Sequence, residues 1–144
     1  MRAALLIAVL VASVGCGAGQ TASGAESTTT AASGTSLQMS VWSEGRGSGP
    51  PDKWALRCDP VGGTLLRRAA ACRQMATMKQ PFAPLRKDLV CTDQYGGPHE
   101  ALIAGTHRGS RIWVILTLRN GCEISRAKRL GFLVPGMVPG ASGS

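Results

Sequence analysis

The chain has 144 residues, and its formal net charge is +8 at pH 7. This length allows one domain with one small core. The basic residues are scattered, and aromatic residues make up only 4% of the chain. The sequence therefore lacks the interleaved basic and aromatic residues typical of nucleic-acid-binding proteins, and we expect no nucleic-acid partner. The positive charge favours solubility and loose attraction to anionic surfaces.

Residues 1–16 have the three parts of an export signal: a charged start at Arg2, an apolar run, and small residues before Cys16. The apolar run is too short to cross a membrane as a helix. Its end resembles the lipobox of bacterial lipoproteins, in which the cysteine carries lipid, although Ser13 stands where leucine is usual. We expect an exported protein, and we favour a lipid anchor to the membrane at Cys16 over free secretion.

Residues 17–35 are rich in Gly, Ala, Ser and Thr and contain no large apolar side chain. Such a segment buries too little surface to offset the chain entropy that folding removes, so it predicts a flexible linker. The folded domain is expected over residues 36–134. Residues 135–144 are rich in Pro, Gly and Ser, and this composition predicts a disordered tail.

Alternation of apolar and polar side chains predicts β-strands in the domain. A first strand starts at Leu37, a second covers residues 54–58, and residues 101–106 and 111–118 form a hairpin. The apolar run at residues 132–134 is expected to add a short edge strand. Strands gathered around one or two helices indicate an α+β fold with an antiparallel sheet.

A helix is expected after the Pro- and Gly-rich loop at residues 59–64, and it should end before Pro81. Thr64 is in position to cap its start. Small and apolar residues recur at helical spacing along it, namely Leu65, Ala69, Cys72 and Ala76. This spacing places Cys72 on the buried face of the helix.

Apart from Cys16, the chain has four cysteines, an even number that is typical of a small exported domain with two disulfides. Of the three possible pairings, we favour Cys58 with Cys72, because the helix can bring Cys72 back to the end of the second strand. This choice leaves Cys91 with Cys122. The cysteine spacings match neither a zinc site nor a redox motif, so no metal is expected.

The two histidines, His99 and His107, lie in the loop before the hairpin and at its turn. No nucleophile elbow, metal-binding histidine pair or Gly-rich phosphate loop accompanies them. We interpret both as solvent-facing residues. The sequence predicts a protein that is not an enzyme and that needs no cofactor.

Short motifs surround and connect the four cysteines: Cys58-Asp59-Pro60, Gly62-Gly63-Thr64, Ala70-Ala71-Cys72, Pro81-Phe82, Lys87-Asp88-Leu89-Val90-Cys91-Thr92, Tyr95-Gly96-Gly97-Pro98, Gly105-Thr106-His107-Arg108-Gly109 and Asn120-Gly121-Cys122-Glu123-Ile124. Together, and in this order, they resemble the subtilisin-inhibitor-like family of secreted bacterial serine-protease inhibitors, over about residues 37–134.

The resemblance implies an α+β fold in which two helices pack on one face of an antiparallel sheet of about five strands. It also implies that the first cysteine joins the second and that the third joins the fourth, in agreement with the pairing favoured above. Family members commonly form dimers through the sheet, so a homodimer is expected.

In the family, the bond offered to the protease lies two residues after the third cysteine. Carried onto this chain, this reactive bond joins Asp93 to Gln94. The expected protease-contact residues beside it are Cys91, Thr92 and Tyr95. Asn120 matches the family's asparagine that supports the loop from beneath.

Asp93 departs from the family pattern, in which a long side chain such as Met or Lys often precedes the reactive bond. An ionised carboxylate would have to enter the largely apolar pocket of a subtilisin-type protease, at a cost of up to several kcal/mol. Three interpretations of Asp93-Gln94 therefore stay open. The target protease has a basic or roomy pocket, the inhibitory function has been lost, or the two residues are an ordinary polar loop tip.

We predict a substrate-like inhibitor of an extracellular serine endopeptidase. Its partner is expected to be a subtilisin-like or trypsin-like protease, or one that accepts acidic residues. The alternative is a non-inhibitory cell-surface lipoprotein that uses the same scaffold as a binding module, and a soluble enzyme ranks a distant third.

Overall fold

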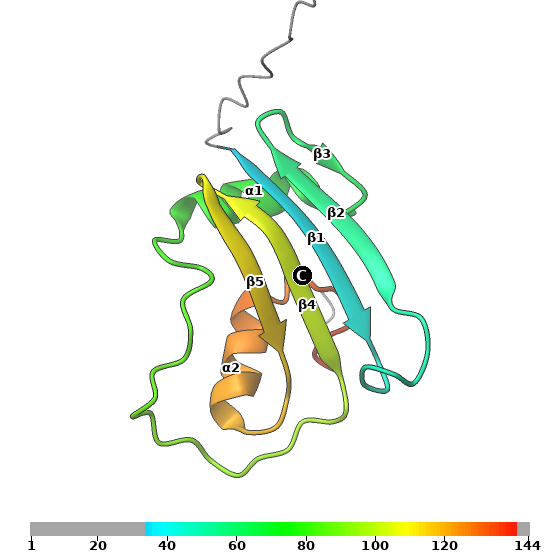
Figure 1. The fold of residues 1–144 in the computed structure, drawn as a ribbon, viewed down its shortest axis with the longest axis vertical. Helices are drawn as coiled ribbons and strands as arrows, with labels where there is room; N and C mark the ends of the chain where they lie inside the picture. The colour runs from blue at the N-terminus through cyan, green and yellow to red at the C-terminus, as the bar shows by residue number, and fades with distance from the viewer. Residues whose placement is uncertain (1–33, 141–144) are drawn as a thin grey trace, which may run out of the picture.

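The computed structural model describes residues 34–140. Five strands form one antiparallel sheet in the order β3-β2-β1-β4-β5, with two helices on one side of it (Figure 1). This architecture confirms the predicted α+β fold. The elements in chain order are β1 (Thr35–Trp42), β2 (Asp52–Cys58), β3 (Gly62–Gly63), α1 (Arg68–Thr77), β4 (Glu100–His107), β5 (Ser110–Leu116) and α2 (Gly121–Leu130).

The centre of the sheet is β1, which pairs along its whole length with β4 and, from Thr35 to Val41, with β2. Its side chains alternate as predicted: Leu37, Met39 and Val41 are buried against the helices. In β4, Gly105 has φ +140 and lies against β1 so closely that a Cβ atom there would overlap the carbonyl oxygen of Ser36. Only glycine fits this position without moving the central strand.

The two helices pack their apolar side chains on the same face of the sheet as the buried residues of β1. From α2, the side chains of Ile124, Ala127 and Leu130 enter the core. From α1, Ala71 and Met75 do so. Both disulfides form as predicted, Cys58–Cys72 between β2 and α1 and Cys91–Cys122 between the long loop and α2.

The helix α1 begins later than predicted and turns a different face to the core. Thr64 does not cap it: its hydroxyl accepts a hydrogen bond from the backbone N–H of Ala55 in β2. Ala69 and Ala76 are exposed, whereas Met75 is buried. The sequence pattern failed here because the loop of residues 59–64 forms the small strand β3, which takes Thr64 into the sheet.

The prediction for the end of the chain was wrong in two respects. Residues 132–134 form turns rather than an edge strand, and Leu133 and Val134 are buried in the core. Within the segment predicted to be a disordered tail, Met137 is fully buried as well. These apolar side chains fill the end of the core beyond α2, which gives the segment enough burial to fold. Residues 1–33 and 141–144, with the predicted export signal, most of the linker and the lipid site Cys16, lie outside the described residues.

The side chain of His107 is buried, contrary to the prediction that both histidines face solvent. Its Nδ1 lies 2.8 Å from the hydroxyl of Thr35, and its ring packs edge-on against Phe82. Its Nε2 is buried and has no hydrogen-bond partner among residues 34–140. Burial and the neighbouring Arg108 cation lower the pKa of His107 from its ordinary value of 6.5.

We expect this histidine to make folding stability depend on pH. The unfolded chain binds the proton first, because its His107 pKa is the higher one, so stability is lost as the pH falls below about 6.5. Urea unfolding between about pH 7.5 and pH 5 should show this loss in the natural protein and a flatter profile in His107→Gln. His99→Gln is the control, and equal pH profiles for the natural protein and His107→Gln would contradict the prediction.

Candidate functional site

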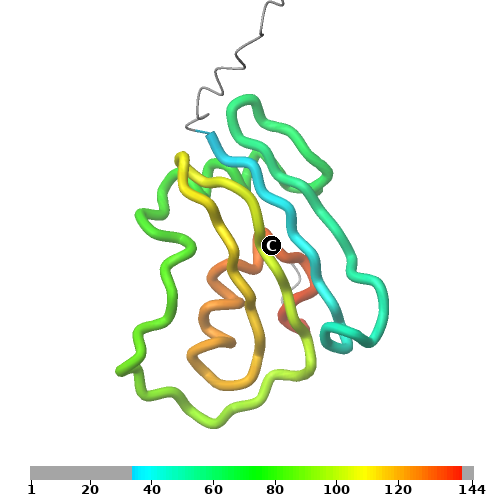
Figure 2. Tube along the Cα trace, in the orientation of Figure 1, coloured from blue at the N-terminus to red at the C-terminus, as the bar shows by residue number. Residues whose placement is uncertain are grey.

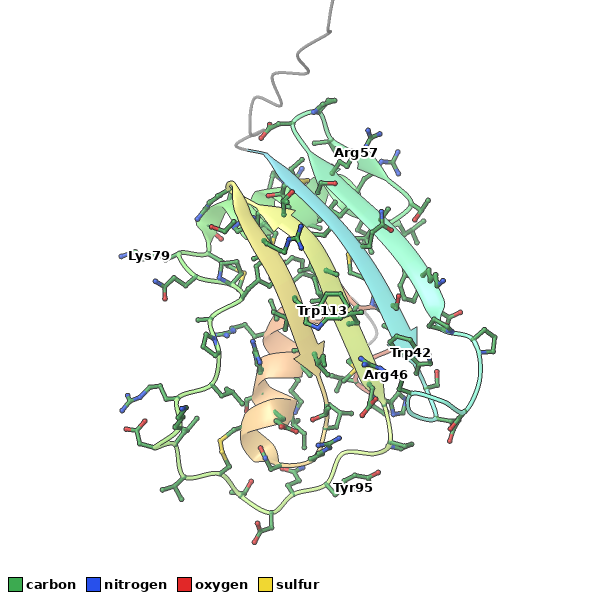
Figure 3. The ribbon with its side chains drawn as sticks, viewed as in Figure 1. Trp42, Arg46, Arg57, Lys79, Tyr95 and Trp113 are labelled. Atoms are coloured by element: carbon green, nitrogen blue, oxygen red, sulfur yellow. A yellow bond between two sulfur atoms is a disulfide. The ribbon has the colours of Figure 1, made fainter. Side chains whose placement is uncertain are left out.

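A long segment without helix or strand, residues 78–99, connects α1 to β4 (Figure 2). It runs down one side of the molecule and across its lower end, from Lys79 past Tyr95 in the view of Figure 3. Its start is bound to the body of the protein by Arg108, whose guanidinium donates to the carbonyl oxygens of Ala76, Met78 and Lys79. The segment therefore leaves α1 in a fixed direction.

The part of this segment after Cys91 is held at both ends. The disulfide to Cys122 brings the two Cα atoms within 5.3 Å of each other. The carbonyl oxygen of Thr92 accepts a hydrogen bond from the N–H of Gly121 at 3.0 Å, and the N–H of Gly96 donates to the carbonyl oxygen of Leu118 at 2.8 Å. The three residues between these two bonds, 93–95, form a short bridge across the end of the molecule that contains no turn or bend.

The two glycines in these contacts are required by close approach. A Cβ atom on Gly121 would overlap the hydroxyl of Thr92. A Cβ atom on Gly96 would lie 3.0 Å from the Cβ of Leu118 and 3.1 Å from the Cδ1 of Ile124. The backbone of the bridge thus rests directly on the start of α2 and on the residues that precede it.

The side chains of the bridge are exposed. Thr92, Asp93, Gln94 and Tyr95 all face solvent, and Tyr95 is 66% exposed. Of the seven large hydrophobic side chains exposed in the described part of the chain, three lie in or just before the bridge, namely Leu89, Val90 and Tyr95. Exposed apolar side chains next to a fixed backbone are typical of a protein-binding surface.

The two carboxylates of the segment differ in their surroundings. Asp88 pairs with the guanidinium of Arg86 at 2.5 Å, and this hydrogen bond lowers the Asp88 pKa below its usual value. Asp93 has no hydrogen bond or ion pair with any residue of the described chain. Its charge therefore stands uncompensated at the tip of the bridge.

Asn120, the residue expected to support the loop, caps the helix whose first two residues hold the bridge. Its side-chain oxygen accepts a hydrogen bond from the N–H of Glu123 at 3.0 Å, which makes Asn120 the N-cap of the helix. The Glu123 carboxylate in turn accepts from the hydroxyl of Thr117 and from the N–H of Arg119. The N–H of Gly121 has no partner within the helix and donates to the carbonyl oxygen of Thr92 instead. The positive end of the helix dipole favours a carbonyl oxygen at this position.

The structure places the expected reactive bond Asp93–Gln94, its flanking residues and Asn120 at one end of the molecule, whereas Cys16 lies outside the described residues. Sequence reasoning missed Arg108, Arg126 and Gly121 as supports of the loop. The arginines bind carbonyl oxygens 29 to 44 positions away in the chain. No local sequence pattern predicts such contacts.

The arrangement presents an exposed peptide whose backbone is held at both ends. Among residues 34–140, no group of three or more His, Cys, Asp or Glu side chains could hold a metal ion. None of the helices in this part of the chain is long and apolar enough to span a membrane.

A family model described as "Subtilisin inhibitor-like" matches residues 31–120, which is more than half of the chain. The chain belongs to the subtilisin inhibitor-like family. The match covers the sheet, α1, the whole of the long segment and Asn120. Proteins of this family are secreted and are non-enzymatic protease inhibitors.

Among solved structures, this subtilisin inhibitor-like chain is similar to sermetstatin of Streptomyces caespitosus, which was crystallised in complex with the subtilisin of Bacillus licheniformis. The two sequences are 22% identical, the match covers 65% of this chain and 90% of that chain, and the TM-score is 0.43. The comparison with curated proteins gives no match.

We predict that the two disulfides of this subtilisin inhibitor-like domain contribute similarly to stability but differently to the bridge. Chain entropy makes each worth roughly 3 to 4 kcal/mol, so Cys91→Ser/Cys122→Ser and Cys58→Ser/Cys72→Ser should melt at similar, lower temperatures. Only the first double variant releases residues 92–96 from α2. Limited proteolysis followed by mass spectrometry should find rapid cutting near Asp93 in that variant alone, and equal cutting in both would contradict the prediction.

Proposed function

We propose that the protein is a substrate-like inhibitor of an extracellular serine endopeptidase, and that the Asp93–Gln94 bond is the one it offers. One observation carries the proposal: a disulfide and two backbone hydrogen bonds hold the peptide from Thr92 to Gly96, while its side chains face solvent. Membership of the subtilisin inhibitor-like family supports the same function.

Binding follows from the shape of the bridge. A protease binds its substrate as an extended strand, so a peptide already fixed in that shape avoids most of the ordering cost that a flexible peptide meets. Leu89 and Val90 before the bond and Tyr95 after it add apolar surface that a protease covers on binding.

Resistance to cleavage follows from the same anchors. When the serine of the protease attacks the carbonyl carbon of Asp93, the bond to Gln94 breaks and the new amine takes up a proton. Thr92 on one side and Gly96 on the other stay bound to the body of the inhibitor. At an effective concentration on the order of 10⁵ M or more, the amine attacks the acyl-enzyme again before water does.

Asp93 determines which protease the loop suits. Its carboxylate has no partner among the described residues, and burying it unpaired in an apolar pocket costs up to several kcal/mol. A pocket with a basic side chain pairs with this charge and offsets the cost of burying it. We therefore propose a target that accepts acidic residues, in preference to subtilisin-like or trypsin-like proteases.

We predict that substitutions at Asp93 change the target. Asp93→Met should strengthen inhibition of subtilisin-like proteases by at least about a hundredfold, because it removes a charge that costs several kcal/mol to bury. Asp93→Lys should do the same for trypsin-like proteases. Inhibition constants against both classes and a glutamyl-type protease measure this, and Asp88→Asn is the control for charge on the same segment.

The same panel of proteases and variants distinguishes the inhibitor from the alternative function, a non-inhibitory binding module of the cell surface. The unusual carboxylate of Asp93 is the observation that favours it. If every variant and the natural protein leave all proteases active, the inhibitor proposal is wrong and the binding-module function takes its place.

We propose further that two copies associate through the sheet. The face opposite the helices carries an uncovered apolar patch of Trp113 and Ile115 on β5 beside Ala104 and Leu102 on β4, and Figure 3 shows Trp113 at the middle of this face. Trp113 is 67% exposed. A second copy would remove this apolar surface from water.

Sedimentation equilibrium of the oxidised chain is expected to show a dimer and Trp113→Glu a monomer, because the charge would be buried without a partner. Leu66→Glu is a matched control, since Leu66 is 88% exposed and lies outside the sheet. A monomeric natural protein, or a dimer that survives Trp113→Glu, would argue against association through this patch.

The lipid anchor at Cys16 is also a proposal, since it rests on the sequence of residues 13–16 alone. Mass spectrometry of the native protein tests it directly. A first residue other than lipidated Cys16 means that the protein is freely secreted.

A further inference from the structure

One side of α2 faces the long segment and carries Cys122, Arg126 and Arg129 at helical spacing. Cys122 holds Cys91 covalently. One turn further, Nη2 of Arg126 donates to the carbonyl oxygens of Phe82 at 3.4 Å and Ala83 at 3.1 Å. The same helix face therefore holds the segment at two places, which enclose an arm of residues 84–90.

We infer that Arg126 is a positioning residue of the inhibitor, which fixes the arm that leads to the reactive bond. This inference rests on the proposed function at Asp93–Gln94. Arg126 does not reach that bond itself; it acts through the backbone of Phe82 and Ala83.

Apart from the long contact of the Cys122 Sγ with the carbonyl oxygen of Val90 at 3.8 Å, the arm has no hydrogen bond to the body of the described protein. Within residues 84–90 the hydrogen bonds are local: Arg86 binds the side chain of Asp88, and the N–H of Leu89 donates to the carbonyl oxygen of Arg86. The side chain of Phe82 packs against the core, so the arm begins where that packing ends. Arg126 is the last polar anchor before the disulfide.

Clefts lie behind the arm, so few side-chain contacts hold it there and the hydrogen bonds of Arg126 matter more for its position. Two clefts, of about 400 Å³ and about 520 Å³, lie there, and Leu85 and Arg126 line both. The first cleft extends toward Glu100 and Thr117, and the second toward Val90. Side chains do not pack in this space. The guanidinium of Arg126 is therefore the contact that holds the start of the arm to α2.

The guanidinium is partly withdrawn from water for this contact. Its Nε is buried without a partner among the described residues, while Nη2 reaches the two carbonyl oxygens. Burial and the neighbouring Arg129 lower the Arg126 pKa, and the group remains a cation at neutral pH. A charged donor to neutral carbonyl oxygens makes a strong hydrogen bond in such a site.

The consequence for inhibition is kinetic. After the bond at Asp93 is cut, religation requires that the acyl group of Asp93, which follows the arm through Cys91 and Thr92, keep its place beside the new amine. An arm released from Arg126 moves within the hollow behind it, and water then completes hydrolysis more often. Loss of Arg126 should convert the inhibitor into a slow substrate.

The test uses the full oxidised chain in three variants. Arg126→Met keeps the length and packing of the side chain but removes its donors, and Arg126→Lys keeps a cationic donor. Arg129→Met is the matched control, since it removes the same charge one turn away on the same helix face. The measurements are the rate at which the inhibited protease cuts at Asp93, and amide hydrogen exchange of residues 84–90.

We expect at least tenfold faster cutting and faster exchange in Arg126→Met, an intermediate effect in Arg126→Lys, and natural behaviour in Arg129→Met. Exchange in β1 should stay unchanged, which distinguishes a loose arm from a loosened core. Natural rates in Arg126→Met, or equal effects in Arg129→Met, overturn the inference. If Arg126→Met does not fold, a fourth variant replaces it: slower cutting in Arg126→Lys than in Arg126→Gln decides in favour of the donor, and equal rates in these two decide against it.

Failure of the proposed function gives a different result. If the natural protein inhibits no protease, the rate of cutting is no longer informative, but hydrogen exchange of residues 84–90 still shows whether Arg126 holds the arm. Unchanged exchange in Arg126→Met then overturns the positioning role as well.

Discussion

The contact between the start of α2 and the backbone at Thr92 is the constraint on which the proposed site depends. It has a covalent part, the disulfide from Cys91 to Cys122, and a polar part, the hydrogen bond from Gly121 to Thr92. Both parts come from the first two residues of one helix. The position of the loop is therefore set by whatever sets the position of that helix.

Core packing, a helix cap and a side-chain contact together determine where α2 lies. Its apolar side packs Ile124, Ala127 and Leu130 into the core that the sheet also fills. Its start is fixed by Asn120 as N-cap, and Glu123 ties the cap to the chain that leaves β5. A rigid sheet thus positions a helix, and the helix positions an otherwise irregular loop. This order explains how a segment without regular structure keeps a defined shape.

Most of the fold could be predicted from the sequence, because alternation in β1 and in the hairpin is a local signal with strong physical meaning. The pairing of Cys58 with Cys72 followed from helix geometry. The errors arose where distant parts of the chain decide the outcome: Met137 is buried because α2 leaves the end of the core open, and His107 because Phe82 covers it. The bridge was located by resemblance, whereas its support by Arg108 and Arg126 depends on contacts that no local pattern encodes.

The anchors of the bridge are backbone atoms and a disulfide, and this has a consequence for specificity. The carbonyl oxygen of Thr92 and the N–H of Gly96 carry the hydrogen bonds, while the side chain of Asp93 takes part in none of them within the described chain. The residue at this position can therefore change its charge and length without disturbing the frame that presents it. The carboxylate of Asp88 is paired with Arg86, whereas that of Asp93 has no partner among the described residues. The frame and the side chain that it presents are physically separable, so a chain that keeps the family's frame can carry an acidic residue at position 93.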